Sequence, residues 1–466
     1  MTTGFDLPGL DDVVRPGDAE YDEARRVWNG MVDRRPAGIV RGRSVADVQA
    51  AVAAASRLSV PLAVRGGGHN VAGNGTVNGG LVLDLGTWNG VEVDVARGVV
   101  RVSPGAVLGD VDAATEPLGL VVPIGVVSRT GMSGLTLGGG VGWLTRSYGL
   151  TIDSLVAAEV VTAGGDVLRA SASDNPDLFW GLRGGGGNFG VVTTMELRAY
   201  PWPVDFFAGN LIYRRPKWRA AIRAWRDWGL ALPDELTTIL TFLAPPPTWG
   251  LGDETLLLIG GTWAGRDRNE GRAHLAALAD AITPDETSMD QTTWIAWQSA
   301  ADELFPKGVR AYWKNASFDR LDDELMDVVE RHAATLDWQR TGIDIHLMGG
   351  AVARVAEDAS AFPNRAPSYL LNIYGTWDEP ERDEDRIAWV RAFHSNVAAH
   401  AALGQYVNFL GREADGDDAR EAALTVYGPD KLRRLIELKR RYDPANLFRL
   451  NHNIDPAWST EDEAVP

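Results

Sequence analysis

Arg65-Gly66-Gly67-Gly68-His69-Asn70 follows directly on a short apolar run, residues 60–64, that is typical of a β-strand. Two more glycine clusters occur at residues 138–140 and 184–187. Glycines let the backbone come close to another group, and the successive N–H groups of such a turn can bind an anion. One cluster alone would be an ordinary tight turn. Three of them, each beside a polar or aromatic residue, predict a ligand that needs several such turns, most commonly a dinucleotide pyrophosphate.

Other motifs built on glycine or histidine do not fit. None of the clusters ends in the Gly-Lys-Ser/Thr of a P-loop. Residues 185–190 have the Rossmann spacing, but residues 191–197 follow a strand pattern, whereas a Rossmann turn leads into a helix. Metalloprotease and lipase signatures are missing, and the 7 histidines have no metal-ligand spacing. The sequence therefore predicts neither a Rossmann domain nor a metal site.

The composition is that of a globular protein, and 466 residues suffice for two packed domains. The net charge of −18 argues against nucleic acid or an anionic membrane as a partner. The N-terminus lacks a secretory signal pattern and no apolar run is long enough for a membrane span, so we expect a cytoplasmic protein. Because the chain has no cysteine, any redox chemistry must come from a cofactor. The oligomeric state is left open.

Regular elements are predicted along most of the chain. Ser44 before Val45, Val48 and Val52 is typical of the N-cap of an amphipathic helix. Further strands are predicted at residues 81–85, 91–95, 99–102, 237–243, 255–262, 343–348 and 369–374, a hairpin at 160–170, and helices at 108–116, 218–230, 321–336, 385–401 and from 430 to Asp443-Pro444. The change to longer elements after residue 203 predicts a second domain.

Five motifs occur in the same order as in a known family. They are Arg65-Gly-Gly-Gly-His69-Asn70-Val-Ala-Gly73, Gly131-Met-Ser-Gly134-Leu-Thr-Leu-Gly138-Gly-Gly140-Val-Gly142-Trp143, Tyr148-Gly-Leu, Asp177-Leu-Phe-Trp-Gly-Leu-Arg-Gly-Gly-Gly-Gly-Asn188-Phe-Gly190 and Tyr406-Val-Asn408. Together they resemble the berberine-bridge-enzyme-like FAD-linked oxidases, a branch of the vanillyl-alcohol-oxidase type. The resemblance extends over residues 37–455.

The resemblance implies an α+β fold with a two-part FAD-binding domain of the PCMH type. The N-terminal part would comprise residues 1–203, and a C-terminal segment, residues 405–466, would return to it. Between them, residues 204–404 would form a substrate-binding domain with an antiparallel sheet flanked by helices.

The resemblance also implies which residues hold the FAD. His69 would be bonded covalently to the 8α carbon of the flavin, and a neutral imidazole is a suitable nucleophile for that bond. The other cofactor-binding positions would be Arg65, Gly66, Gly67, Gly68, Asn70, Gly73, Gly125, Val126, Thr130, Gly131, Gly134, Gly138, Gly140, Gly142, Trp143, Asn188, Gly190, Val192, Tyr406 and Asn408. Many relatives have a second link through a cysteine at the position of Val127. Its absence points to the singly linked bacterial branch, similar to 6-hydroxynicotine oxidases.

The implied reaction is an oxidation in which a hydride leaves a carbinol or amine carbon of a small molecule and molecular oxygen becomes hydrogen peroxide. Two alternatives stay open: a dehydrogenase with another acceptor, and a flavin-binding protein without turnover. In relatives the residue at Thr130 is suspected of gating oxygen, and a β-branched residue there favours an oxidase. Phe409 stands where many relatives have a tyrosine base, which favours the inactive alternative. A sugar, an alkaloid-like amine or a secondary metabolite could each be the substrate.

Phe409 cannot accept a proton, so another residue must act as the base. Residues 343–348 alternate apolar and polar side chains, which places Asp344 and His346 on one face of a strand. His346 is the first choice because an ordinary imidazole pKa, about 6.5, suits a base at neutral pH, and Asp344 would orient it. The alternative is a solvent-facing edge of the sheet. Tyr148 and then Tyr406 are the reserve candidates.

Overall fold

The computed structural model describes residues 7, 9–203, 206–289, 292–411 and 418–460. Its first layer is a four-stranded sheet in the order β1 (Val13–Val14), β2 (Gly38–Arg41), β4 (Leu81–Asp84) and β3 (Leu62–Arg65), in which β2, β4 and β3 run parallel. The predicted helix is α2 (Val45–Leu58), and Ser44 caps it, because the Ser44 Oγ accepts from the Asp47 N–H at 3.2 Å. The first glycine loop begins where β3 ends.

A second, antiparallel sheet follows in the order β5 (Val91–Asp94), β6 (Val99–Val102), β10 (Val191–Arg198), β8 (Leu155–Val161) and β9 (Val167–Ser171). The predicted hairpin is confirmed as β8 and β9. The glycines at residues 184–187 lead into strand β10 and not into a helix, as expected. Helices α3 (Leu108–Thr115), α4 (Met132–Gly138) and α7 (Pro176–Leu182) contribute buried side chains to the same hydrophobic core as this sheet.

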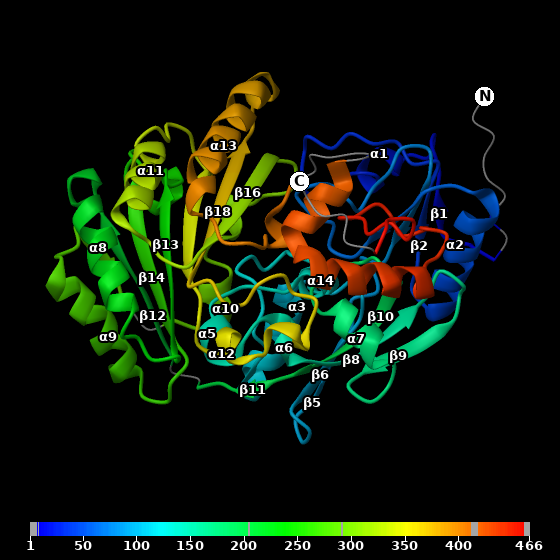
Figure 1. Ribbon diagram of the computed structural model, residues 1–466, viewed down its shortest axis with the longest axis horizontal. Helices are drawn as coiled ribbons and strands as arrows, with labels where there is room; N and C mark the ends of the chain where they lie inside the picture. Colours follow the sequence, from blue (N-terminus) through cyan, green and yellow to red (C-terminus); the bar gives the residue numbers. More distant parts are fainter. Residues whose placement is uncertain (1–6, 8, 204–205, 290–291, 412–417, 461–466) are drawn as a thin grey trace.

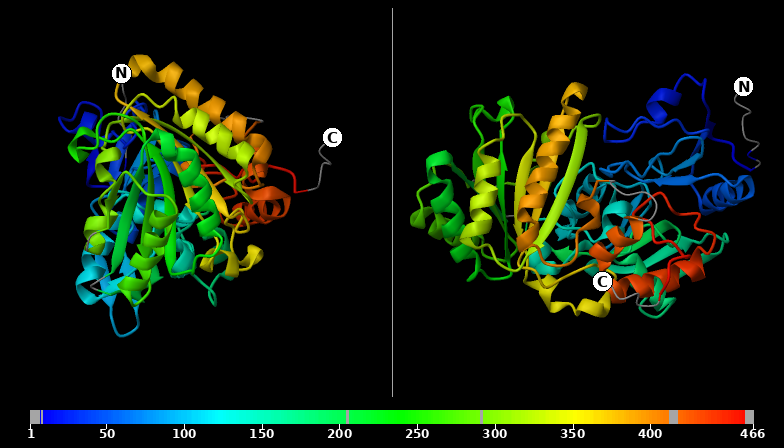
Figure 2. Two further views of the ribbon diagram at one scale, coloured as in Figure 1. Left: turned by 90° about the vertical axis from the view of Figure 1, so that its left-hand side faces the viewer. Right: turned by 45° about the horizontal axis from the view of Figure 1, so that its top comes forward.

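A seven-stranded antiparallel sheet forms the other half of the molecule (Figure 1). Its strands stand in the order β15 (Glu286–Ser288), β12 (Phe207–Tyr213), β14 (Leu256–Trp263), β13 (Leu236–Leu243), β17 (Gly342–Leu347), β18 (Tyr369–Trp377) and β16 (Arg310–Phe318). The left view of Figure 2 shows helices in front of this sheet, and they are α8 (Trp218–Gly229), α9 (Arg268–Ala281), α11 (Asp323–Ala333) and α13 (Asp383–Val397). The predicted antiparallel sheet flanked by helices is therefore confirmed.

The alternation of side chains gives the two faces of this sheet different roles. Ile343, Ile345 and Leu371 point to the helical side and join one hydrophobic core with Trp225 and Val329. The intervening residues point to the opposite face, which is turned toward the other half of the molecule (Figure 1). The polar residues of β17 lie on that opposite face.

The last helix, α14 (Asp418–Tyr442), returns to the N-terminal half and packs against α7. Leu435 and Leu438 enter the same core as Leu178. The sequence predicts a helix from residue 430, whereas the structure has helix from Asp418 with a kink at Gly428. Gly428 has a φ of 71° and Pro429 follows it, so the predicted helix is only the part after the kink.

Further short elements are α1 (Tyr21–Ala24), β7 (Leu120–Val121), α5 (Thr145–Tyr148), α6 (Thr151–Ser154), β11 (Tyr200–Pro201), α10 (Trp294–Gln298), α12 (Ala351–Arg354) and several 3₁₀ turns, among them the one at Val407–Phe409. None of the helices in the described ranges combines the length and the apolar character needed to cross a membrane.

Candidate active site

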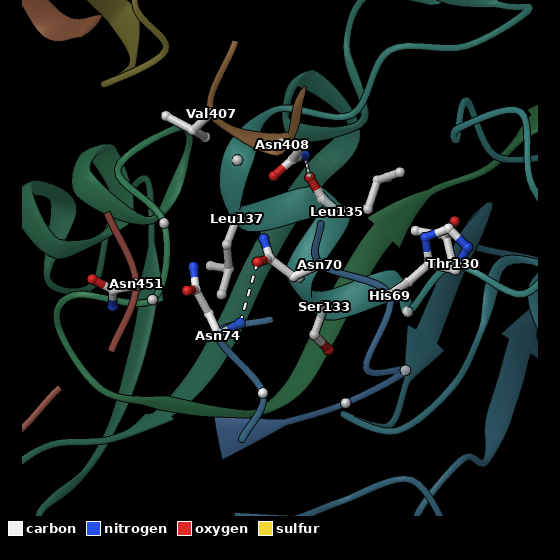
Figure 3. Close-up of a pocket in the computed structure, with 18 of the residues that line it drawn as sticks. His69, Asn70, Asn74, Thr130, Ser133, Leu135, Leu137, Val407, Asn408 and Asn451 are labelled. Atoms are coloured by element: carbon white, nitrogen blue, oxygen red, sulfur yellow. Dashed lines mark hydrogen bonds between the residues drawn. The ribbon is translucent and has the colours of Figure 1, made fainter. Parts of the chain in front are cut away.

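One cavity lies between the two halves, where the glycine loops face strands β16, β17 and β18. Figure 3 shows side chains from separate segments around it, among them His69, Asn408 and Asn451. Nineteen of the predicted site residues line this cavity: Arg65, Gly66, Gly67, Gly68, His69, Asn70, Gly125, Val126, Thr130, Gly131, Gly134, Gly138, Asn188, Gly190, Val192, Asp344, His346, Tyr406 and Asn408. Motifs that are far apart in the sequence therefore meet in one space.

The glycines of the first two clusters allow a close crossing of backbones. A Cβ at Gly67 would lie 2.5 Å from the Gly131 Cα, and a Cβ at Gly131 would lie 2.5 Å from the Gly67 nitrogen. Neither position has room for a side chain. At Gly134 a Cβ would meet nothing within 4 Å, so the backbone itself borders the cavity at this position. Bare, concave backbone of this kind fits a dinucleotide pyrophosphate.

Arg65 supports the first loop from behind. Its guanidinium donates to the Asp84 carboxylate at 2.6 Å and to the Ala24 carbonyl at 2.7 Å. Its aliphatic stem lies under the loop, 3.3 Å from where a Cβ of Gly68 would be. The Arg65 charge is thus already paired within the protein, and the loop's backbone is left to face an anion.

His69 is enclosed at the end of the same loop. Its Nε2 is buried and has no hydrogen-bond partner. Burial lowers the pKa of His69 to about 4, so the imidazole is neutral at physiological pH. The Trp28 indole stacks on the ring, with 4.5 Å between centroids and 20° between planes. A buried, neutral ring with an unused nitrogen fits a covalent bond to a cofactor in the cavity.

Asn188 lines the cavity, yet its side chain serves the protein itself. The Asn188 Nδ2 donates to the carbonyls of Gly185 (2.9 Å) and His452 (3.2 Å), and its Oδ1 accepts from the Ile454 N–H (3.1 Å). The C-terminal segment is tied in this way to the third glycine cluster.

Lys439 completes this attachment. It is fully buried and donates to Asp443 (2.6 Å) and to the carbonyls of Asn188 (2.9 Å) and Phe448 (3.0 Å). In the sequence, Lys439 is only the first residue of a basic run, residues 439–441, near the end of the predicted helix. The fully buried ion pair depends on the fold around it, so the basic run alone could not reveal it.

Tyr406 and Asn408 form a joined pair over the second glycine cluster. The Tyr406 hydroxyl accepts from the Gly140 N–H (3.0 Å) and from the Asn408 Nδ2 (2.8 Å). The Asn315 side-chain amide exchanges two hydrogen bonds with the Tyr406 backbone, of 2.9 and 3.0 Å. Burial raises the pKa of Tyr406 to about 12, so its hydroxyl stays protonated at neutral pH.

Asp344 and His346 face the cavity from β17. Burial raises the pKa of Asp344 to about 7, against the lowering by hydrogen bonds from Thr241 and Tyr374. Burial lowers the pKa of His346 to about 4. The solvent-facing alternative is therefore wrong. The sequence predicted a pKa near neutrality for His346, whereas in the structure it is Asp344 whose pKa lies near neutrality.

The neighbouring strand adds a polar group that the motifs did not indicate. Asn372 lies directly opposite Asp344 in the register of β17 and β18. It is buried, and its Oδ1 has no hydrogen-bond partner. Phe305 and Trp313, also unpredicted, line the cavity with Phe409. An aromatic wall thus stands next to three polar side chains.

Five predicted residues do not line the cavity: Gly73, Gly140, Gly142, Trp143 and Tyr148. Gly73 turns back on Val32, and Gly142 is pressed against the Ile124 carbonyl, 1.8 Å from where its Cβ would be. These glycines shape the loops and do not line the cavity.

The two aromatic residues of this set pack elsewhere. Trp143 packs on Trp297, at 5.1 Å between centroids. Tyr148 stacks on Tyr200, at 4.2 Å, and burial raises its pKa. Tyr148 is therefore corrected from a candidate base to a packing residue.

Comparison with known proteins agrees with this arrangement. A family model described as "FAD binding domain" matches residues 36–171, and one described as "Berberine and berberine like" matches residues 405–455. An uncharacterized FAD-linked oxidoreductase of Bacillus subtilis, YgaK, is 30% identical over 95% of this chain and 96% of its own. The (R)-6-hydroxynicotine oxidase of Paenarthrobacter nicotinovorans is 29% identical over 98% and 99% of the two chains.

Solved structures extend the agreement to the whole fold. The crystal structure of 6-hydroxy-D-nicotine oxidase from Arthrobacter nicotinovorans superposes with a TM-score of 0.85 at 25% identity, covering 98% of this chain and all of the other. The glucooligosaccharide oxidase of Acremonium strictum superposes with a TM-score of 0.84 at 24% identity, over 96% of this chain and 98% of the other, and shares the fold.

Proposed function

This chain belongs to the berberine-bridge-enzyme-like family of FAD-linked oxidoreductases, and we propose that it is an oxidase of small organic molecules. A hydride would leave a carbinol or amine carbon of the substrate, and molecular oxygen would be reduced to hydrogen peroxide. The observation that carries the proposal is that His69 lines the same cavity as Asp344 and His346, the polar residues of β17.

The chain would divide its work between three segments. Residues 1–203 and 405–466 would hold the FAD, and residues 204–404 would hold the substrate. Two features support this division: the strands of the seven-stranded sheet all lie between residues 207 and 377, and α14 packs against α7. Residues 1–6, 8, 204–205, 290–291, 412–417 and 461–466 lie outside the described residues.

The FAD, when bound, supplies the two-electron acceptor, and His69 would carry it through a single covalent bond. The neutral, buried imidazole supports this role. The absence of cysteine means that a second, cysteinyl link cannot form. The dinucleotide would bind to the backbone at Gly134 and to the first glycine loop, which Arg65 supports through its ion pair with Asp84.

Asp344 would accept the proton that leaves the substrate's hydroxyl or amine. A carboxyl group with a pKa of about 7 is half ionised at neutral pH and is thus suited to general-base catalysis. His346, neutral because of its low pKa, would accept or donate a hydrogen bond to the substrate and orient it. We therefore propose Asp344 as the base, in place of His346, which the sequence favoured.

Thr130 supports oxygen as the acceptor. It lines the cavity between the first two glycine clusters. In the family that the sequence resembles, a β-branched residue at this position accompanies oxidase behaviour. The substrate would be a compact molecule with an apolar, flat part, since Phe305, Trp313 and Phe409 form one wall.

Anaerobic mixing tests the reaction in two separate steps. The protein is mixed without oxygen with a panel of aromatic alcohols, secondary amines and xylooligosaccharides, and bleaching of the flavin absorbance reports hydride transfer. Air is then admitted, and peroxide is measured against the substrate consumed. Equal amounts of peroxide and oxidised substrate are expected. Reoxidation that is rapid only with an added quinone would instead identify a dehydrogenase.

A further inference from the structure

Residues 28–30, here called the bridging segment, cross from the cofactor side to the edge of the seven-stranded sheet. On one side the Trp28 N–H donates to the Gly68 carbonyl at 3.0 Å. On the other side the Trp28 carbonyl accepts from the Gly308 N–H at 2.8 Å. At Gly30 a Cβ would lie 2.1 Å from the Gly308 oxygen, so the two backbones meet without room for a side chain. Main-chain contacts therefore hold the bridging segment from both sides.

Asn29 strengthens the same bridge with its side chain. Its Nδ2 donates to the carbonyls of Val71 (2.7 Å) and Ala311 (2.8 Å), and its Oδ1 accepts from the Ala311 N–H (3.2 Å). Only 3% of Asn29 is exposed. A buried amide whose polar atoms are all paired across two segments makes the connection specific.

The Trp28 indole is fixed against the ring of His69. Its Nε1–H donates to the Phe305 carbonyl at 2.9 Å, and the edge of Trp313 packs on it at 5.5 Å between centroids. The indole stacks on the imidazole at 4.5 Å and 20°. The His69 Nε2 has no hydrogen-bond partner, so no hydrogen bond at that nitrogen fixes the ring, whereas the stacked indole restricts its plane.

We propose that Trp28 is a positioning residue for the covalent attachment of the flavin, because its indole holds the His69 ring in the plane in which a ring nitrogen can meet the flavin's C8 methyl carbon. The inference rests on the proposed His69 link. In the attachment, a C–H bond of the methyl group and the imidazole N–H bond break and an N–C bond forms. Two electrons and two protons pass by way of the isoalloxazine to molecular oxygen, which becomes hydrogen peroxide.

Time courses of attachment test this role without any substrate. Wild type, Trp28→Leu and Trp28→Phe are expressed under riboflavin limitation and incubated with FAD in air. Flavin in the acid-precipitated pellet reports covalent attachment, flavin in the supernatant reports reversible binding, and peroxide is measured alongside. Trp28→Leu is expected to bind FAD but to attach it about tenfold more slowly, which corresponds to about 1.4 kcal/mol of activation free energy and lies within the range of an aromatic stack. Trp28→Phe keeps a ring and should attach within about threefold of the wild-type rate.

Trp338→Leu is the matched control, because Trp338 packs on Arg386 and Trp389 away from the cavity. It should attach FAD at the wild-type rate. Attachment by Trp28→Leu at the wild-type rate would overturn the positioning role while leaving the His69 link intact. A colourless wild-type pellet would overturn both. If thermal unfolding shows that Trp28→Leu does not fold, Trp28→Met takes its place, since methionine fills the same volume without a ring.

Discussion

At the scale of single residues, His69 is the point on which the cofactor assignment depends. His69→Ala removes the imidazole, so we expect its acid-precipitated pellet to be colourless while the wild-type pellet stays yellow. His274→Ala, which changes a histidine of the outer helix α9, should retain the yellow pellet. A colourless wild-type pellet would exclude the covalent bond.

Asp344 is the residue for which the structure changes the expected chemistry. A general base must be deprotonated, so the rate of flavin reduction in wild type should rise as the pH passes through about 7, the raised pKa of Asp344. Asp344→Asn should lower that rate by roughly 10²- to 10⁴-fold and remove the rise. Stopped-flow absorbance across pH 5–9 measures both effects.

His346→Gln distinguishes the two polar residues of β17. Its glutamine keeps a hydrogen-bonding group, so a smaller fall in the reduction rate is expected and the rise with pH should remain. The opposite result, with His346→Gln slow and Asp344→Asn within a few-fold of wild type, would restore His346 as the proton acceptor.

At the scale of elements, helix α14 holds the C-terminal wall of the cavity through Lys439. Lys439→Met leaves the Asp443 carboxylate buried without its cation, which costs about 3–5 kcal/mol. The contacts with Asn188 and Phe448 are lost as well, so reversible FAD binding should weaken and the melting temperature should fall.

A double variant separates charge from packing at this position. Lys439→Met with Asp443→Asn removes both charges and keeps an amide oxygen that can accept from one of the two backbone N–H groups, Leu447 or Phe448, so it should recover part of the lost stability. Glu437→Gln, on the exposed side of the same helix, should leave the melting temperature unchanged. A Lys439→Met protein with wild-type stability would show that the buried pair is not needed.

At the scale of the whole molecule, α10 joins the two halves through buried polar groups. The Trp294 Nε1–H donates to Asp112 of α3 at 2.7 Å, and the Gln298 Nε2 donates to the Gly125 carbonyl at the cavity wall at 2.9 Å. Burial raises the pKa of Asp112 to about 7. The folded protein therefore binds this proton more tightly than the unfolded chain does.

The sign of the resulting pH dependence follows from that difference. The contribution of Asp112 to stability is complete below its ordinary pKa, near 4, and is lost as the pH rises through about 7. Asp112→Asn should thus melt higher than wild type at pH 8, and the difference should shrink toward pH 5. Asp253→Asn, an exposed change, serves as control. Differential scanning calorimetry from pH 5 to pH 8 measures these melting temperatures. An Asp112→Asn protein that melts lower than wild type at pH 8 would contradict the raised pKa of Asp112.

The sequence by itself determined the local chemistry of this protein. The glycine loop from Arg65 to Asn70 could be predicted because Gly67 and Gly131 are required where two backbone segments touch, and such a requirement is visible in the residue types. Strand and helix periodicity likewise gave the hairpin of β8 and β9 and the paired face of Asp344 and His346. The absence of cysteine excluded a second flavin link.

Only the tertiary structure decided how those groups behave. The pKa values of Asp344 and His346 are reversed because burial by segments distant in sequence removes water from both, and desolvation disfavours whichever form is charged. Trp28 stacks on His69, and Tyr148 stacks on Tyr200 and not against the cavity. Both contacts depend on packing between segments that are distant in the sequence. Periodicity specifies which face a side chain takes, whereas long-range contacts specify what that face meets.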